Sequence, residues 1–282
     1  MDWDPDFLAR SPVFEPLRVH APAFGSCWPT LAELQTLLDR GVPPVRNAAG
    51  LALRVVPQAR RRATFEDGYE PRIFLRGELQ LRERNWHDLL NVLTWLAFPR
   101  AKAAMNERHF HALEAQRGTG MRNRGPVQDA LTLFDEGGVI VASSDDRLLA
   151  LTRGFEWKEL FWVRRDDVRA RMRFFVLGHA IHEKALEPFP GITARGILVD
   201  MPEDLLHAPS PGLLADLDAR TAARIGDPSV FSGTRDLAPV PILGVPGWCA
   251  ANEREHYYDD VGYFRPGRRG RRDQGRATRD KR

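Results

Sequence analysis

The sequence predicts an α+β fold in a single domain, residues 1–265, followed by a basic, disordered tail, residues 266–282. Several segments repeat apolar residues every three or four positions, which is typical of helices, and shorter runs rich in β-branched and aromatic residues are typical of strands. No internal repeat or linker-like stretch interrupts residues 1–265. We therefore expect helices to predominate over two short hairpins or a small mixed sheet, between irregular Pro-rich ends.

The first predicted elements are an aromatic arm, a helix and a strand. Residues 1–30 contain five prolines and five Trp or Phe residues, so this arm should lack long regular elements but pack on the body. Thr30 and Glu33 form a capping-box pattern, which predicts a helix that ends at Gly41. Residues 51–56 have the composition of a strand.

Turn and breaker residues divide the rest of the chain. Arg76-Gly77 and Gly137-Gly138 predict hairpin turns, Pro99 suits the first turn of a helix, and Pro188 ends one. The predicted elements are a hairpin at 72–81, helices at 86–97 and 100–115, a basic loop at 117–126, a second hairpin at 131–142, helices at 145–153 and 166–187, a strand at 196–199 and a helix at 211–224.

The basic character of the chain, with a pI near 9.1, comes from its end. The formal charge is +3, but residues 265–282 hold nine Lys or Arg and two Asp, so the remainder carries −4. Such a tail can bind nucleic acid or another polyanion weakly, or remain a solvated terminus. The chain has two distant cysteines, no signal-peptide pattern and no apolar run of membrane-spanning length, and we expect it in the cytoplasm.

Polar residues follow two consecutive predicted helices between residues 84 and 109. His87 and Asn91 share one face of the first helix, and Lys102, Asn106 and His109 share one face of the second. Asparagine is a poor helix former, so a ligand or a hydrogen-bonded neighbour is expected to hold these stripes in place. The structural alternative is that they form helix caps and a buried polar network, with Asn85 as N-cap and Asp88 in the first turn.

Two further segments carry groups that could take part in chemistry. His179 and Glu183 are four residues apart and could bind one metal ion or pair with each other, although their order is not that of a zinc metalloprotease. Asp135 and Glu136 precede Gly137-Gly138, where acids usually serve a turn and metal ligation is the minor interpretation. The aromatic and basic run 157–165 could stack bases, but such runs more often belong to a core.

The chain resembles a bacterial family that is described as domain of unknown function 3025. The motifs are Tyr-Glu-x-Arg-Ile from Tyr69, Arg-Asn-Trp-His-Asp from Arg84, Trp-x-x-Phe-Pro from Trp95, Trp-Lys-x-Leu-Phe-Trp from Trp157 and Gly-His-Ala-x-x-Glu-Lys from Gly178. The resemblance covers about Asp4 to Pro266. It implies a bacterial cytosolic protein and implies no activity.

These patterns leave three hypotheses. The first is a pocket that binds a divalent metal ion and hydrolyses a substrate. The second is a ββα-type nuclease, in which the hairpin at 72–81 and a helix hold the metal. The third is a non-catalytic interaction protein whose polar network is structural. The candidate catalytic residues are His87, Asp88 and Glu183; the candidate metal ligands are His87, His179 and Glu183; the candidate ligand-binding residues are Arg84, Asn85, Trp86, Asn91, Lys102, Asn106 and His109.

Overall fold

The fold was determined as a computed structural model, which describes every residue except 1, 42–43, 60–63, 118–124, 209 and 268–282. The predicted α+β class is confirmed. The helices are α1 (Leu31–Asp39), α2 (Tyr69–Arg76), α3 (Trp86–Ala97), α4 (Pro99–Gln116), α5 (Pro126–Gly137), α6 (Asp146–Gly154), α7 (Arg165–Arg171), α8 (His179–Leu186), α9 (Glu203–Leu206) and α10 (Ser210–Gly226). The strands are β1 (Arg54–Pro57), β2 (Glu78–Leu81), β3 (Gly138–Ser143), β4 (Met172–Val176), β5 (Thr193–Asp200) and β6 (Ala238–Pro241).

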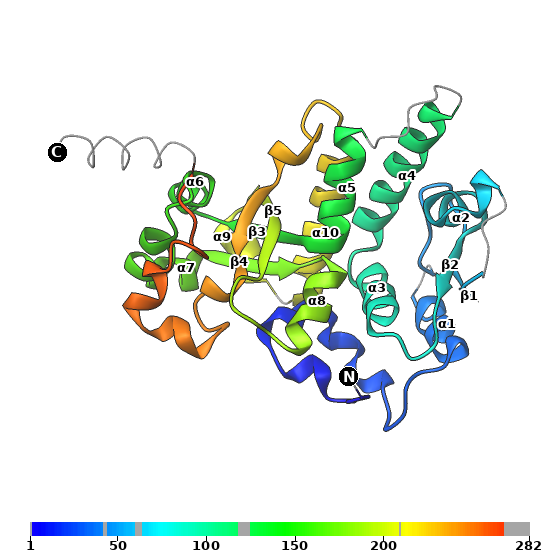
Figure 1. Cartoon of the computed structure of the whole chain (residues 1–282), viewed down its shortest axis with the longest axis horizontal. Helices are drawn as coiled ribbons and strands as arrows, with labels where there is room; N and C mark the ends of the chain where they lie inside the picture. Colours follow the sequence, from blue (N-terminus) through cyan, green and yellow to red (C-terminus); the bar gives the residue numbers. More distant parts are fainter. Residues whose placement is uncertain (1, 42–43, 60–63, 118–124, 209, 268–282) are drawn as a thin grey trace.

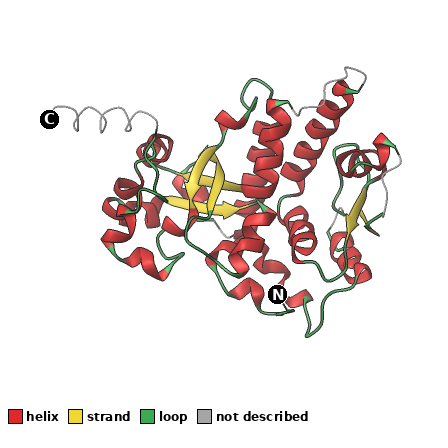
Figure 2. Ribbon diagram, viewed as in Figure 1, coloured by secondary structure: helices red, strands yellow, loops and turns green. Residues whose placement is uncertain are grey.

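A mixed sheet with the strand order β4-β3-β5-β6 forms the centre of the molecule (Figure 1). The inner strands β3 and β5 run parallel, and each edge strand is antiparallel to its neighbour. All six residues of β3 are buried, as expected for a strand that is covered on both faces. Figure 2 shows helices on either side of this sheet.

Alternate residues of the inner strand belong to two hydrophobic cores. Ile140 and Ala142 pack with α4, α5 and α10, which lie on one face of the sheet. Val139 and Val141 point to the other face and join the core that contains α3, α6, α8 and the N-terminal arm. The alternation follows from the two-residue period of a strand. Buried apolar residues of α5 belong to the first core and those of α8 to the second.

The N-terminal arm packs on the body, as the sequence predicts. Trp3 stacks on Trp86 with ring centroids 5.2 Å apart, and Phe14 stacks on His182 with centroids 5.6 Å apart. Phe14 is fully buried. Because Trp86 begins α3 and His182 lies within α8, the arm packs against both helices.

The predicted hairpin at 72–81 is wrong. Residues 69–76 form helix α2, and the strand β2 that follows pairs in parallel with β1. Gly77 has the positive φ expected of a turn, 66°, but it serves as the C-cap of the helix. A Cβ atom at Gly77 would lie 2.6 Å from the carbonyl oxygen of Ala52, so glycine is also required for the close approach of the two segments.

The second predicted hairpin, at 131–142, is also wrong in its first half. Residues 126–137 form helix α5, which begins with Pro126 in its first turn, and only the second half is a strand, β3. The predicted long helix 166–187 is in fact α7, strand β4 and α8. Met172-Arg-Phe-Phe-Val is a short run of good strand formers that fills the edge of the sheet, and tertiary pairing with β3 decides its conformation.

Other predictions are confirmed. The capping box at Thr30 and Glu33 is present, Pro99 lies in the first turn of α4, and α3 has the predicted bounds. The predicted basic loop and tail lie largely outside the described residues, in 118–124 and 268–282. In the described part of the chain, no helix combines the length and the apolar character that a membrane crossing requires.

Candidate metal centre

An open cavity of about 490 Å³ lies between α2, α3, α4, α5 and α8. Two of the lining residues are histidines that the sequence analysis predicts as metal ligands, His87 of α3 and His179 of α8. Most of the lining residues are polar, and Phe65 and Tyr69 add aromatic rings to the lining. Such a concave polar site is where a small ligand and a reacting group can meet.

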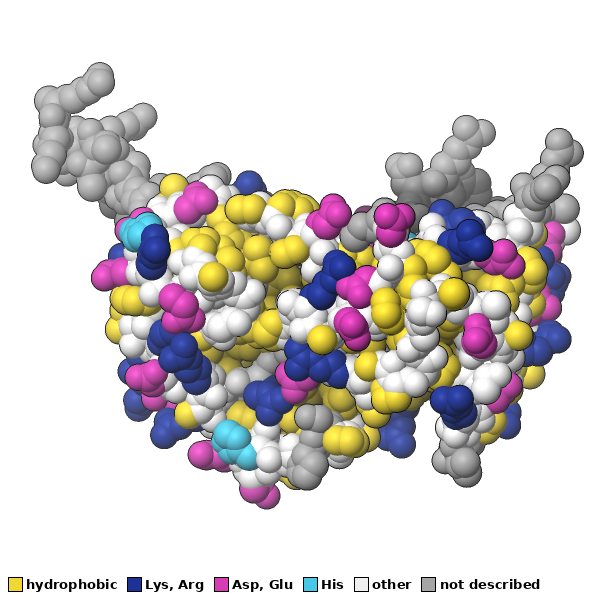
Figure 3. All heavy atoms as spheres, turned by 90° about the horizontal axis from the view of Figure 1, so that it is seen from below, with side chains coloured by type: hydrophobic (Ala, Val, Ile, Leu, Met, Phe, Trp, Pro, Cys, Tyr) yellow, Lys and Arg dark blue, Asp and Glu magenta, His cyan; other side chains and the backbone are white. Residues whose placement is uncertain are grey.

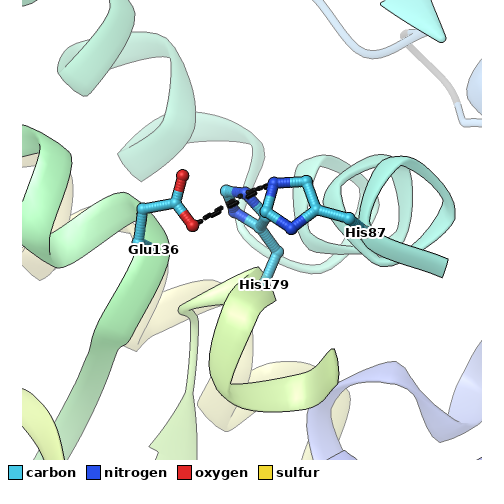
Figure 4. Close-up of side chains that lie close together, drawn as sticks. All are labelled: His87, Glu136 and His179. Carbon is cyan, nitrogen blue, oxygen red and sulfur yellow. Dashed lines mark hydrogen bonds and ion pairs between the residues drawn. The ribbon is translucent and has the colours of Figure 1, made fainter. Parts of the chain in front are cut away.

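Three side chains converge at one end of the cavity: His87, His179 and Glu136 (Figure 4). The Nε2 atoms of the two histidines lie 2.9 Å apart, and their rings are nearly perpendicular. Oε2 of Glu136 lies 3.6 Å from Nε2 of His179 and 4.0 Å from Nε2 of His87. Two imidazoles and a carboxylate within 4.8 Å of one another can hold a metal ion.

Three separate chain segments position this triad. His87 lies in the first turn of α3, which the side chain of Asn85 caps by accepting a hydrogen bond from the backbone of Asp88. His179 is the first residue of α8, and Glu136 lies in the last turn of α5. The two histidines are 92 residues apart in the chain.

Glycines allow α5 and α8 to meet at this point. A Cβ atom at Gly178, next to His179, would lie 2.6 Å from the backbone oxygen of Glu136 and would also collide with the backbone of Gly138. A Cβ atom at Gly138 would in turn lie 2.8 Å from the ring of Phe134. The close backbone contact therefore helps to fix the relative position of Glu136 and His179.

The other ring nitrogen of His87 is held by Glu183. Nδ1 of His87 donates a hydrogen bond of 2.9 Å to Oε2 of Glu183. In the tautomer with its proton on Nδ1, the lone pair of Nε2 is directed toward His179 and Glu136. A carboxylate that fixes the orientation of a histidine in this way is a common feature of metal sites.

His179 is buried, and burial lowers its pKa from 6.5 to about 3. The neutral imidazole is the form that binds metal ions. Nδ1 of His179 lies 3.9 Å from Oδ2 of Asp135. Burial alone would raise the pKa of Asp135, but the positive charge of Lys102 and the proximity of His179 bring it below its ordinary value. Asp135 is therefore a carboxylate at neutral pH.

Lys102 is the centre of a buried polar network beneath the cavity. Its side chain is only 3% exposed, and Nζ donates to Asp135 and, at 2.8 Å, to Oδ1 of Asn91. Nδ2 of Asn91 donates to the hydroxyl oxygen of Tyr69 at 2.6 Å. The predicted ligand-binding residues Asn91 and Lys102 are thus hydrogen-bonded to each other, which is the buried polar network considered above as an alternative to a ligand site. Asn91 also lines the cavity.

Glu70 and His109 lie on the wall of the same cavity. Nδ2 of Asn106 donates to Oε2 of Glu70 at 2.7 Å and to its backbone oxygen at 3.0 Å. Nδ1 of His109 lies 3.7 Å from Oε1 of Glu70. Burial, and then the negative charge of Asp135, raise the pKa of Glu70 from 4.5 to about 7.

The remaining predicted site residues take no part in the triad. Trp86 is buried against the N-terminal arm, Asn85 caps α3, and Arg84 is exposed and does not line the cavity. Asp88 does line it, but both of its carboxylate oxygens accept hydrogen bonds from the side chain of Arg82.

Sequence reasoning missed the role of Glu136 in the triad and the position of Glu70. Glu136 was assigned to a turn because Gly137-Gly138 suggested a hairpin. The opposite evidence was Pro126 followed by Ala130, Leu131 and Phe134, which is the apolar spacing of one helix face. A helix over these residues places Glu136 in its last turn and carries it toward the sheet edge.

The fold and site define an α+β protein with a candidate metal centre at one end of an open polar cavity. The chain belongs to the family described as "Protein of unknown function (DUF3025)", whose sequence model matches residues 53–268. The match includes all residues of the triad and does not include the aromatic arm, residues 1–30. No curated protein and no solved structure matches the chain.

Proposed function

We propose that this protein is a metal-dependent hydrolase that holds one divalent ion with His87, His179 and Glu136. The observation that carries the proposal is the convergence of these three side chains, from three different helices, on one end of an open cavity. Three protein ligands with cavity space beside them are typical of catalytic rather than structural zinc sites, because a position remains for water or substrate.

The distances support a small ion. Two nitrogens bound to tetrahedral zinc at about 2.0–2.1 Å lie about 3.3 Å apart. The Nε2 atoms of His87 and His179 are 2.9 Å apart, so a movement of a few tenths of an ångström accommodates the ion. Oε2 of Glu136, at 3.6 and 4.0 Å from these nitrogens, lies near the third corner of the same arrangement.

This proposal changes the roles assigned to the carboxylates. Glu183, expected to be a ligand or a base, bonds to the nitrogen of His87 that faces away from the triad, and we assign it the orientation of that ring. Asp88 is held by Arg82, and we assign it no proton transfer. The bound ion would lower the pKa of a coordinated water and make it nucleophilic near neutral pH.

The nuclease hypothesis has less support. The hairpin at 72–81, on which it depended, is a helix and a strand. Four carboxylates, but only one Lys or Arg, line the cavity among the described residues: Glu70, Asp88, Asp135 and Glu136 against Arg82. Basic and acidic side chains are also interspersed on the face shown in Figure 3. A site for a phosphodiester backbone would require a surplus of positive charge.

The experiment that tests the function is a hydrolysis assay on zinc- and manganese-loaded protein with p-nitrophenyl esters, p-nitroanilides and bis-p-nitrophenyl phosphate. We expect metal-dependent turnover of an ester or anilide that His179→Ala abolishes and that His111→Ala, a change of an exposed histidine on α4, leaves intact. Turnover that persists in His179→Ala, or an absence of turnover on every probe, contradicts the proposal.

We place this activity in the cytoplasm of a bacterium. The two cysteines, Cys27 and Cys249, are both free thiols, which suits a reducing compartment. The family resemblance supports the bacterial source.

A further inference from the structure

Glu70 is held in a defined orientation on the wall of the cavity that also contains the triad. It lies in the first turn of α2, and its side chain is 20% exposed. Asn106 is itself only 2% exposed. Its Nδ2 donates hydrogen bonds to both Oε2 and the backbone oxygen of Glu70. The other carboxylate oxygen, Oε1, faces His109 at 3.7 Å.

The charged groups around Glu70 come from two helices. On α4, Lys102 and His109 are near it, and on α5 Asp135 is near it. Nζ of Lys102 donates hydrogen bonds to Asp135 and Asn91. The negative charge of Asp135 therefore largely offsets the effect of the Lys102 charge on Glu70. Within the part of the chain that the structure describes, no Lys or Arg forms an ion pair with Glu70.

We propose that Glu70 is the general acid and base of this cavity, and that the cavity acts on bonds whose leaving group must be protonated, above all amides. This role rests on the proposed metal-dependent hydrolysis. It follows from a carboxyl group that lines the same cavity as the triad, with one oxygen held by Asn106 and the other 3.7 Å from Nδ1 of His109. A proton carrier for neutral pH must be able to hold and release its proton there, and the pKa of about 7 at Glu70 meets that requirement.

In the proposed amide hydrolysis, Glu70 accepts one proton and later returns it. A water molecule attacks the carbonyl carbon and forms the new C–O bond while Glu70 accepts its proton. The C–N bond then breaks, and Glu70 returns that proton to the departing nitrogen. The products are a carboxylic acid and an amine, and Glu70 ends in the state in which it began.

The closing experiment compares Glu70→Gln with Glu114→Gln, which changes an exposed glutamate on α4 in the same way. Metal content is measured in both, and kcat is measured on a matched p-nitroanilide and p-nitrophenyl ester across pH 5–9. We expect Glu70→Gln to keep its metal and to lose about 10²- to 10⁴-fold in kcat on the anilide. We expect a smaller loss on the ester, because Glu70 serves the ester only in the attack of water and its leaving group departs without a proton. We also expect the loss of one limb of the pH profile.

A second measurement does not need turnover. Carboxyl-carbon NMR of protein labelled at glutamate should show one resonance, absent in Glu70→Gln, that titrates near neutral pH in the metal-free protein. A titration near 4.5, or equal losses on anilide and ester in Glu70→Gln, overturns the role of Glu70 and leaves the metal centre standing. A metal-loaded wild type that hydrolyses neither probe overturns the proposed function, and this role with it.

Discussion

Replacing Glu70 with glutamine should change the pH dependence of folding stability. Glu70 has a pKa of about 7 in the folded protein and an ordinary value of 4.5 when it is free of its surroundings. The folded state therefore holds the proton more tightly than the unfolded chain does. The stability that this proton contributes is fully present below pH 4.5, and it is lost as the pH rises through about 7.

The size of the effect follows from the same two values. A change from 4.5 to about 7 corresponds to about 3 kcal/mol, at about 1.4 kcal/mol per pKa unit. Solvent reaches part of the side chain, so we expect about 1–3 kcal/mol. Glutamine keeps the acceptor for Asn106 and cannot ionise. Relative to wild type, Glu70→Gln should therefore gain about 1–3 kcal/mol of stability between pH 4.5 and pH 8.

The assay is urea unfolding of the metal-free protein at several pH values, followed by tryptophan fluorescence and circular dichroism. Glu114→Gln serves as the control and should show a pH dependence equal to that of wild type, because this glutamate is exposed. If Glu70→Gln and wild type differ by the same amount at pH 4.5 and at pH 8, Glu70 titrates normally and the electrostatic reasoning for the cavity is wrong.

Three further changes test the supports of the site. Glu183→Gln should weaken zinc binding about 10- to 100-fold while folding stability stays within about 0.5 kcal/mol, as isothermal calorimetry and urea unfolding would show. Lys102→Met should cost about 3–5 kcal/mol in urea unfolding, because it leaves the carboxylate of Asp135 without its buried cation. Gly178→Ala should lower stability by about 1–3 kcal/mol and abolish zinc binding, whereas Gly212→Ala, where nothing lies within 4 Å of the added methyl, should not destabilise the protein.

Each of these results has a clear opposite. Unchanged zinc affinity in Glu183→Gln would mean that the ring of His87 needs no carboxylate to orient it. A Lys102→Met protein as stable as wild type would show that Asp135 is solvated. A Gly178→Ala protein that still binds zinc would show that α5 and α8 do not depend on the close backbone contact for the position of the triad.

The parts of the fold that the sequence predicts well are those that local signals control. Helix α3 begins at Trp86 after its N-cap Asn85, and α4 begins at Pro99; a cap and a breaker mark these positions regardless of the rest of the chain. Helix α5 was missed because Gly137-Gly138 suggested a turn. Gly138 is required for a different reason, the approach of Phe134 and of Gly178, which only the tertiary structure reveals.

The site shows the same limit. His87 and His179 could be singled out from their polar neighbours, but no local pattern shows that residues 92 positions apart meet at 2.9 Å. Glu136 could join them only after residues 126–137 were recognised as a helix. The elevated pKa of Glu70 arises from burial and from Asp135 on another helix, so spacing along the chain contains no sign of it.

The most direct test of the metal centre is its metal content. Untagged wild type, His87→Ala, His179→Ala and the control His111→Ala would be loaded with zinc or manganese, dialysed and measured by inductively coupled plasma mass spectrometry. We predict about one ion per chain in wild type and in His111→Ala, and none in the other two variants. A wild type that retains no ion after loading, or retention in His87→Ala and His179→Ala equal to wild type, would contradict the account.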